Sequence, residues 1–333
     1  MNDPEHHEDW RPSASFRNLR LRAQVLQHIR DFFAQRDVLE VETPLLGSST
    51  NPDPHINCFI TTYVGPQAAH GMPLYLQSSP EFAMKRLLSA GSGPIYQICK
   101  AFRQGERGRL HNPEFTILEW YRPGFDLEAL IGEIEALLHS LFTAINRRLK
   151  ACQIISYQDA FLNTLSLDPL QASAQELAGC ARQHGVDVQG LHSEDRDAWL
   201  DVLMSHCVQP HLGRNRLTFV RDYPESQAAL ARLNPNNNQT ALRFELFIDG
   251  VELANGFQEL TDAGEQRHRF QRQLARRAHQ NQAQPPMDEY LLQALSHGMP
   301  ECSGVALGLD RLIMILAQAT ALSEITAFPI GRI

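Results

Sequence analysis

The first clear pattern in the chain is a set of apolar residues that recur every three or four positions, as on one face of a helix. They are Phe16, Leu19, Ala23, Leu26, Ile29 and Phe33. The pattern stops before residues 38–42, which read as a short strand ended by Thr43-Pro44. The sequence therefore predicts a helix over about 16–33 that leads into a short strand.

A second strand and helix follow. Residues 74–77 read as a strand, and a helix is predicted from Ser79 to about Ala90. Ser79 is expected to be its N-cap, with Pro80 in the first turn and Glu81 favoured by the helix dipole.

Two further strands, 95–103 and 114–121, are joined by the loop 104–113. Asp126 is expected to cap a long helix after them. Its apolar face contains Leu130, Ile134, Leu137, Leu138, Leu141 and Ile145. From about 156 to 238 the chain is mostly helical and carries no chemical motif, so we interpret it as an insertion.

Helical and strand patterns alternate irregularly and no repeat appears, which favours a mixed α+β fold over regular βαβ units. We expect a flexible N-terminus over 1–14 and a single domain over 15–333 that contains the insertion.

Composition narrows the class of protein. The chain has 333 residues, 43% of them hydrophobic, and a net charge of −8, which argues against nucleic-acid binding through bulk charge. Apolar runs are too short for a membrane span and the N-terminus has no apolar signal core, so we expect a cytoplasmic protein. The six cysteines stand singly and indicate no zinc site.

Residues 243–256 contain two strand patterns around Asp249-Gly250, a strong hairpin signal. Counting outward from this two-residue turn gives the expected register. It pairs Glu245 with Ala254 and Phe247 with Glu252, all four on one face.

Glu245 and Glu252 would then be diagonal neighbours about 7–8 Å apart. Two carboxylates so close on a core-side face are costly without a cation between them. Magnesium commonly bridges carboxylates and substrate phosphates, so a nucleotide site is one interpretation. A solvent-facing sheet on which both residues are hydrated is the other.

The strand 114–121 places Phe115, Ile117, Glu119 and Tyr121 on one face. Such a face could stack a base and hold an ammonium group, or simply pack in the core. The loop before it carries four basic residues that could bind a polyphosphate or form a solvated tip. They are Arg103, Arg107, Arg109 and His111.

Near the C-terminus, residues 303–314 read as a strand of small residues that enters a helix. Gly304 and Gly308 would permit close approach of a ligand or of another backbone. The chain has neither a P-loop nor a G-x-G-x-x-G fingerprint, so ATP would not be held in either common way.

In order, these segments resemble motifs 1, 2 and 3 of the class II aminoacyl-tRNA synthetases, and lysyl-tRNA synthetase most of all. The segments are Leu39–Pro44, Phe102-Arg103 with His111–Tyr121, Glu252–Phe257 and Gly304–Arg311. A lysyl-tRNA synthetase would also carry an N-terminal anticodon-binding domain, for which the chain leaves no room before motif 1. The free-standing catalytic domain therefore resembles the elongation factor P lysine ligases, which activate (R)-β-lysine with ATP and transfer it to a lysine of elongation factor P.

The resemblance implies the synthetase fold, an antiparallel sheet flanked by helices, and a nucleotide site. Arg103 is similar to the motif 2 arginine on the α-phosphate, and Arg311 to the motif 3 arginine at the γ-phosphate; both are candidate catalytic residues. Phe115 would lie under adenine and His111 would contact the polyphosphate. The remaining implied ATP contacts are Glu106, Asn112, Gly308 and the two magnesium ligands Glu245 and Glu252.

The resemblance also implies a pocket for lysine or (R)-β-lysine, rich in carboxylates that suit two ammonium groups. Its residues are Ser79, Glu81, Glu119, Tyr121, Asn255, Glu259 and Ala306. Two positions depart from the family pattern. Gly105 stands where an adenine-reading glutamate is usual, with Glu106 next to it, and Ala306 replaces a motif 3 glycine of lysyl-tRNA synthetase.

The same resemblance implies the partners. We expect elongation factor P as the acceptor and a homodimer formed through motif 1, and we expect binding to neither tRNA nor a membrane. A basic helix could dock the acidic factor or be a solvated face. Its residues are Arg267, His268, Arg269, Arg272, Arg276 and Arg277. The alternatives are a truncated lysyl-tRNA synthetase-like enzyme acting on α-lysine and tRNA or a small acceptor, and a non-catalytic ligand sensor.

Overall fold

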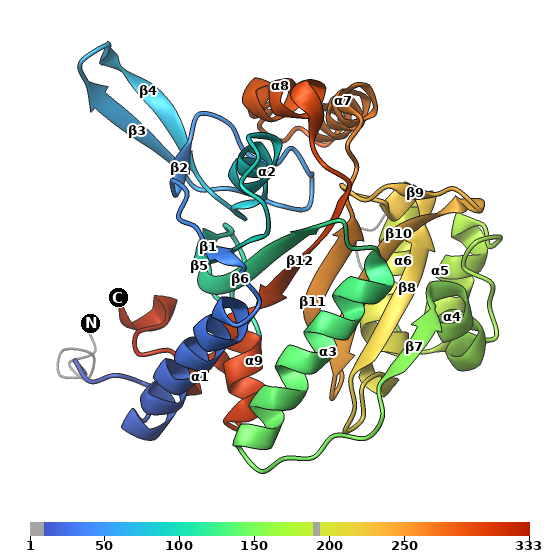
Figure 1. The fold of residues 1–333 in the computed structure, drawn as a ribbon. Helices are drawn as coiled ribbons and strands as arrows, with labels where there is room; N and C mark the ends of the chain where they lie inside the picture. Colours follow the sequence, from blue (N-terminus) through green and yellow to red (C-terminus); the bar gives the residue numbers. More distant parts are fainter. Residues whose placement is uncertain (1–9, 189–193) are drawn as a thin grey trace, which may run out of the picture.

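A computed structural model describes residues 10–188 and 194–333. Its centre is a nine-stranded sheet (Figure 1). From edge to edge its strands are β1 (Leu39–Glu40), β5 (Ile95–Phe102), β6 (Glu114–Pro123), β12 (Cys302–Gly308), β11 (Val251–Gln258), β10 (Asn237–Ile248), β8 (Thr218–Pro224) and β7 (Gln153–Ser156), with β9 (Leu233–Asn234) paired to β10. Among these described strands the edge pairs β1–β5 and β7–β8 are parallel, and the others are antiparallel. The predicted α+β class with an antiparallel sheet is confirmed.

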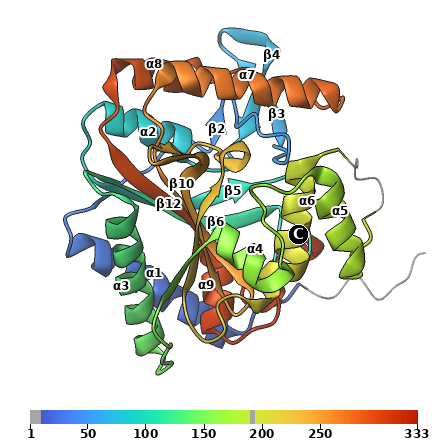
Figure 2. The ribbon, with the colours of Figure 1, turned by 90° about the vertical axis from the view of Figure 1, so that its right-hand side faces the viewer.

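Helices flank the sheet in three groups (Figures 1 and 2). The first group comprises α1 (Phe16–Ala34), α3 (Leu127–Ala144) and α9 (Leu309–Leu316) and covers one face. The second comprises α2 (Glu81–Ser89), α7 (Ala263–His279) and α8 (Glu289–Gly298). The third comprises α4 (Tyr157–Leu165), α5 (Ala174–Gln183) and α6 (Arg196–Leu203) and lies beside β7 and β8.

The predicted N-terminal helix and the long helix after β6 are confirmed, and each begins at a capping side chain. The Ser15 hydroxyl accepts a hydrogen bond from the backbone N–H of Asn18. The Asp126 carboxylate accepts one from Ala129, as expected for an N-cap. Both helices bury their apolar faces against the sheet in the largest hydrophobic cluster.

Alternation along β6 separates the core from the opposite face of the sheet. Leu118 and Trp120 are buried in the cluster under α1 and α3. Glu119 and Tyr121 therefore project from the other face, as the period of two predicts. That second face is where the polar residues of β6, β10, β11 and β12 gather.

The described part contains a second sheet that the sequence indicated only in part. Its strands are β2 (Leu46–Gly47), β4 (Ala68–Leu76) and β3 (Ile60–Gly65). The hairpin β3–β4 projects away from the body of the molecule (Figure 1). Only 74–77 was predicted as a strand, because the hairpin is largely solvent-exposed and lacks a regular buried face.

The helices of the predicted insertion are present, but they end earlier than the sequence suggested. A π-helix, Met204–Val208, and a 3₁₀ turn, Gln209–His211, follow α6. Residues 218–224 are the strand β8 of the main sheet. The helices have their own hydrophobic cluster, which includes Phe247 of β10. Residues 189–193 of the insertion, and 1–9 of the N-terminus expected to be flexible, lie outside the described residues.

The hairpin β10–β11 turns at Asp249-Gly250 as predicted, but the predicted register beyond the turn is wrong. Phe247 pairs with Glu252, whereas Glu245 pairs with Asn255 and not with Ala254. The shift is a β-bulge on β11. Its extra residue makes two successive side chains, Leu253 and Ala254, join the core cluster. Glu245 and Glu252 consequently still share a face, and Asn255 takes the place expected for Ala254.

Candidate functional site

Two adjoining cavities lie on the polar face of the sheet. We call the first the inner pocket; it has a volume of about 180 Å³. The sequence-predicted substrate residues all line it. They are Ser79, Glu81, Glu119, Tyr121, Asn255, Glu259 and Ala306. These residues come from α2, β6, β11 and β12 and from the segments beside them, so the fold assembles the set from distant parts of the chain.

We call the second cavity the outer cleft, with a volume of about 310 Å³. Every predicted nucleotide residue except Glu245 lines it. Those residues are Arg103, Glu106, His111, Asn112, Phe115, Glu252, Gly308 and Arg311. The two cavities adjoin beside the Arg103 side chain. The residues that line both are Ile56, Arg103, Asn255 and Ala306.

Glu119 is a buried carboxylate at the wall of the inner pocket. Its two oxygens accept hydrogen bonds from the Ser79 hydroxyl at 2.6 Å and the Tyr121 hydroxyl at 3.2 Å. Burial, with the nearby charge of Glu81, raises the pKa of the Glu119 carboxyl to about 8. At neutral pH this carboxyl is therefore mostly protonated until a cation enters the pocket.

Ser79 is linked to Glu119 and also to the start of α2. Its hydroxyl accepts a hydrogen bond from the backbone N–H of Glu81 at 3.0 Å. The N-cap position itself belongs to Pro80, which has no side-chain cap, so the predicted capping role of Ser79 is displaced by one residue. The hydroxyl instead orders the turn that carries Glu81 into the pocket.

Lys85 is a functional candidate that sequence reasoning missed. Its side chain is 1% exposed, and its Nζ lies 2.6 Å from Glu81 Oε1 and 2.5 Å from Glu259 Oε2. Burial by itself would lower the pKa of the Lys85 ammonium, but the charges of Glu259 and Glu81 outweigh it and raise that pKa. Part of this contact could have been predicted from the sequence, because Glu81 and Lys85 are four residues apart on one helix and such a spacing favours an ion pair.

Gly304 forms a wall of the inner pocket where no larger residue fits. A Cβ at this position would lie 2.4 Å from the Tyr121 ring and 2.6 Å from Glu259 Oε1. The close approach expected from this glycine is therefore a contact with pocket side chains. Ala306, two residues along β12, lies between Glu119 of β6 and Asn255 of β11 in the sheet.

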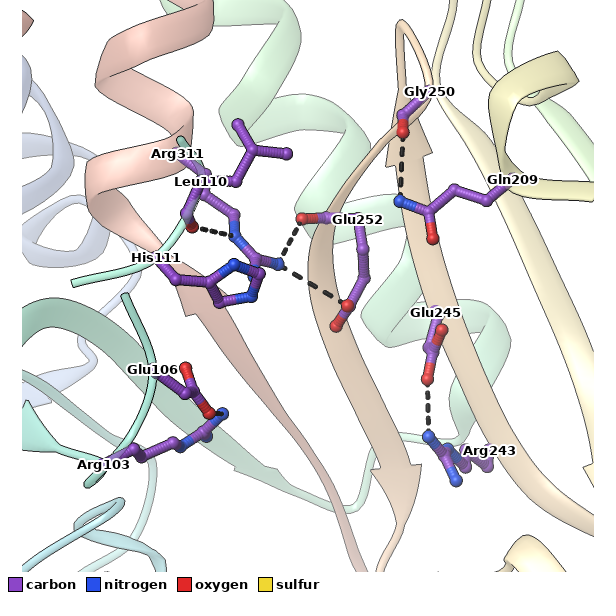
Figure 3. Close-up of polar contacts among 10 residues, drawn as sticks. All are labelled: Arg103, Glu106, Leu110, His111, Gln209, Arg243, Glu245, Gly250, Glu252 and Arg311. Atoms are coloured by element: carbon purple, nitrogen blue, oxygen red, sulfur yellow. Dashed lines mark hydrogen bonds and ion pairs between the residues drawn. The ribbon is translucent and has the colours of Figure 1, made fainter. Parts of the chain in front are cut away.

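Arg311 is the centre of a cluster at the far side of the outer cleft (Figure 3). Its Nη1 donates to the Glu252 carbonyl at 2.9 Å and lies 3.5 Å from Glu252 Oε2. Its Nη2 lies 2.8 Å from His111 Nε2. Burial and the positive charge of Arg311 lower the pKa of His111, so this imidazole is neutral at physiological pH.

Arg103 projects from the end of β5 into both cavities. Its guanidinium carbon lies 5.1 Å from the centre of the Phe115 ring, and its Nη1 lies 3.7 Å from Glu106 Oε1. Gly105 has a φ of +87°, a left-handed conformation that favours glycine at this turn. The turn leaves Glu106 lining the outer cleft.

We expect Glu106→Gln to raise the KM for ATP about fivefold, because the change keeps the shape and hydrogen-bonding oxygen but removes the charge that faces the cleft. Amino-acid-dependent exchange of pyrophosphate into ATP measures this KM. An ATP KM equal to that of the wild type would refute a role for Glu106 in place of the glutamate that Gly105 replaces.

Glu245 is the predicted nucleotide residue that does not line the outer cleft. It lies on the next strand and forms an ion pair with Arg243 at 2.5 Å (Figure 3). Burial and the charge of Glu252 raise the pKa of Glu245. The charge of Glu252 thus acts on Glu245, but the cation beside Glu245 is Arg243.

The other loop arginines do not line either cavity. Arg107 is exposed, and Arg109 donates a hydrogen bond to the carbonyl of Thr320 at 2.9 Å. Of the four basic loop residues, Arg103 and His111 are the ones that face the cleft.

A partly buried network that the sequence did not predict anchors Asp310, the residue before Arg311 on α9. Asp310 accepts hydrogen bonds from Arg22 at 2.6 Å and from the backbone N–H of Thr116 at 2.7 Å. Arg22 also donates to the Thr116 hydroxyl. The network joins α1, β6 and α9 directly behind the outer cleft.

The basic helix α7 uses much of its charge within the chain. Buried Arg277 donates to the carbonyls of Asp53 and Ile56, two residues at the cavities. Arg269 donates to the carbonyls of Ala229 and Ala231. Both residues therefore have structural roles, and the solvated-face interpretation does not hold for them.

The comparisons with known proteins agree with this geometry. Residues 4–332 match the family model described as tRNA synthetases class II (D, K and N). The chain therefore belongs to the class II tRNA synthetase family.

Its relatives are similar over nearly their whole length. The protein named "Elongation factor P--(R)-beta-lysine ligase" from Edwardsiella ictaluri is 49% identical over 323 residues, which is 97% of this chain and 98% of that protein. Proteins of the same name from Proteus mirabilis and Salmonella typhi are 48% and 46% identical, over 324 and 323 residues and with the same shares. The described part of this chain has no helix of the length and apolarity that a bilayer crossing requires.

Proposed function

We propose that this protein is an ATP-dependent ligase that activates (R)-β-lysine as an adenylate and transfers it to a lysine side chain of elongation factor P. The observation that carries the proposal is the junction of the two cavities. A pocket with three glutamates and Asp53 adjoins, beside Arg103, a cleft that contains His111 and Arg311. The names of the full-length relatives supply the acceptor and the isomer.

Adenylate formation requires the substrate carboxylate to attack the α-phosphate of ATP in line, while the bond to the β-phosphate breaks and pyrophosphate leaves. Arg103 lies at the junction, so its guanidinium stabilises the charge that develops on the α-phosphate oxygens. Arg311 and neutral His111 hold the β- and γ-phosphates, and Phe115 supports the adenine ring. The site contributes positioning and charge stabilisation, with no general base needed for this step.

Glu252, which lines the outer cleft, would hold a magnesium ion that is also bound by phosphate oxygens, and Glu245, which lies outside the cleft and pairs with Arg243, is the second candidate ligand. Magnesium prefers oxygen ligands and commonly takes only one or two from the protein. Burial and mutual repulsion of this pair raise the pKa of Glu245, an electrostatic cost that a cation between the two would relieve. When bound, magnesium neutralises polyphosphate charge, while Arg243 keeps Glu245 oriented.

The inner pocket supplies the recognition of the amino acid. Glu81, Glu119 and Glu259 provide carboxylate oxygens for the two ammonium groups, and the Tyr121 hydroxyl and Asn255 amide add polar contacts. Once the adenylate forms, the acceptor lysine attacks its carbonyl carbon, AMP leaves with the bonding electron pair, and an amide results.

The proposal also includes the oligomeric state of the protein and its place in the cell. Large apolar side chains are exposed on β1, on the β3–β4 hairpin and close to β2. They are Leu39, Leu45, Leu46, Ile60, Val64 and Met72. A homodimer formed through this motif 1 region would cover part of this surface. Modification of a translation factor places the reaction in the cytoplasm.

Ala306→Gly is expected to relax the preference for the β-isomer by about tenfold, because one methyl-sized change in a pocket is worth roughly 1–3 kcal/mol of discrimination. The Ala306 methyl lies at the passage between the two cavities, where the carboxylate end of the substrate must pass. The ratio of kcat/KM for (R)-β-lysine and α-lysine in pyrophosphate exchange measures the effect. An unaltered ratio would show that Ala306 does not select the isomer.

The direct test is transfer of radiolabelled α-lysine and (R)-β-lysine, with ATP and Mg²⁺, to purified elongation factor P and in parallel to bulk tRNA. Label on the protein, stronger with the β-isomer, is expected. Label on tRNA alone would identify a truncated synthetase-like enzyme. Failure to form an adenylate with either amino acid would favour a ligand sensor.

A further inference from the structure

Lys85 places a positive charge behind the wall of the inner pocket, next to the lining residues Glu81 and Glu259. Its ammonium is 1% exposed and contacts one oxygen of Glu81 and one oxygen of Glu259. Glu259 is equally buried, at 1% exposed, and Glu81 is 13% exposed at the pocket wall. Nothing assigned so far to the reaction uses this lysine.

The two carboxylates come from unconnected elements. Glu81 begins α2, whereas Glu259 follows the end of β11. Two buried carboxylates facing one site would repel and protonate without a compensating cation. Lys85 is therefore the cation that lies between the two carboxylates and fixes one against the other before any substrate arrives.

We infer that Lys85 is a positioning and specificity-determining residue that sets the charge and the spacing of the carboxylate pair receiving the two ammonium groups of the substrate. The inference rests on the proposed function, since it needs a diamine substrate. The lysine engages Glu81 Oε1 and Glu259 Oε2, which leaves the second oxygen of each free. The free Glu259 Oε1 faces Gly304, which lines the inner pocket.

The net charge of the inner pocket explains why it selects a substrate with two ammonium groups. With all of them ionised, the four carboxylates at the site, Asp53, Glu81, Glu119 and Glu259, outnumber its three cations, Lys85, Arg103 and Arg243, by one. A substrate with two ammonium groups and one carboxylate balances this charge, whereas an analogue with a single ammonium leaves a buried carboxylate unpaired. The spacing of the two free oxygens then distinguishes diamines whose ammonium groups are different distances apart.

Other titratable groups around the lysine belong to the neighbouring strands. Besides Glu81 and Glu259, they are Glu119 and Tyr121 of β6 and Cys302 of β12. Burial raises the pKa values of Tyr121 and Cys302, so both stay neutral in the physiological range. The charge next to the lysine therefore depends on Lys85 and these three carboxyls, and the other charged residues that line the pocket are Asp53, Arg103 and Arg243.

Lys85→Met, which keeps the length of the side chain and removes its charge, tests the inference. We expect the KM for (R)-β-lysine in pyrophosphate exchange to rise about 30-fold, because the paired carboxylates lose their common cation. The KM for ATP should stay within twofold. Lys100→Met is the matched control, since Lys100 forms a half-exposed ion pair with Glu114 at 3.2 Å and should leave both KM values unchanged.

The pH dependence separates an electrostatic role from a structural one. In Lys85→Met the loss should be smaller at pH 9 than at pH 7, because burial raises the pKa of Glu259 to about 7 even beside Lys85, and alkaline pH ionises this carboxyl when the lysine is gone. In Lys85→Ala, ethylammonium should restore part of the lost affinity and ethanol should not. Circular dichroism verifies folding of each variant.

If Lys85→Met does not fold, the inference can be tested with the double variant Lys85→Met/Glu259→Gln. This variant removes the charges of both Lys85 and Glu259. It is expected to fold and, because Glu81 has also lost its lysine partner, to bind (R)-β-lysine more weakly than Glu259→Gln alone. Equal binding by the two variants would show that Lys85 does not position Glu81.

Several outcomes would overturn the inference. They are a KM for (R)-β-lysine in Lys85→Met equal to that of the wild type, an equal loss at both pH values, and rescue by ethanol as well as by ethylammonium. Absence of exchange with either lysine isomer in the wild type would instead refute the proposed function itself. The two failures are thus distinguishable in one assay.

Discussion

Arg103→Ala is expected to lower kcat for adenylate formation by about 100- to 1,000-fold, the usual loss when a donor to a developing oxyanion is removed. Arg103 is the cationic side chain shared by the inner pocket and the outer cleft. An α-phosphate at that junction gains negative charge on its non-bridging oxygens in the transition state. The KM for the amino acid should change little, since carboxylates provide most of the binding.

Two variants make this prediction specific. Arg103→Lys keeps the charge but lacks the planar fork of donors, so it should recover only part of the activity. Arg107→Ala, in the same loop but lining neither cavity, is the matched control and should retain wild-type kcat. Pyrophosphate exchange at saturating substrates gives kcat in each case. A kcat for Arg103→Ala within tenfold of the wild type would contradict the assignment.

The strand faces explain why so much of the site could be predicted from the sequence. Period-two alternation in β6 separates Glu119 and Tyr121 from Leu118 and Trp120, whatever lies beyond the sheet. The Asp249-Gly250 turn fixes the hairpin for the same local reason, with both residues at positive φ. Local patterns therefore define which side chains share a face.

Contacts between elements that are far apart in the sequence could not be predicted from such local patterns. The bulge at Leu253 follows from how β11 fits the core, and it replaces Ala254 by Asn255 opposite Glu245. Lys85 reads as an ordinary helix lysine until Glu259 is brought beside it. Register shifts and buried charge networks depend on tertiary packing, which no local period encodes.

Segments without a regular buried face were the other source of error. The strands β3 and β8 lie in regions that the sequence assigned to no strand. β3 is mostly exposed, and β8 sits inside a stretch dominated by helical patterns. In both cases the neighbouring strands decide the structure more than local propensity does.

The KM for (R)-β-lysine is expected to fall about 50-fold as pH rises from 6 to 8.5, because binding of a diammonium substrate requires Glu119 to lose its proton. Burial and the charge of Glu81 raise the pKa of this carboxyl to about 8 in the free protein. Below that pH the free pocket holds a proton that the bound cation displaces, so raising the pH strengthens binding. Above about pH 8 the carboxyl is already ionised and the dependence levels off.

Glu119→Gln provides the control for this titration. The amide cannot ionise, so the variant should bind (R)-β-lysine weakly at every pH. Its KM should keep only the smaller change below about pH 7 that comes from Glu259, whose pKa burial raises to about 7. The KM for ATP, measured in the same exchange assay, should vary much less, because Glu119 lines the inner pocket and not the outer cleft. A pH profile of KM for (R)-β-lysine that is the same in Glu119→Gln and in the wild type would assign the titration to another group. Such a result would leave Glu119 neutral in the complex, with its hydrogen bonds to Ser79 and Tyr121 as its sole contribution to the pocket.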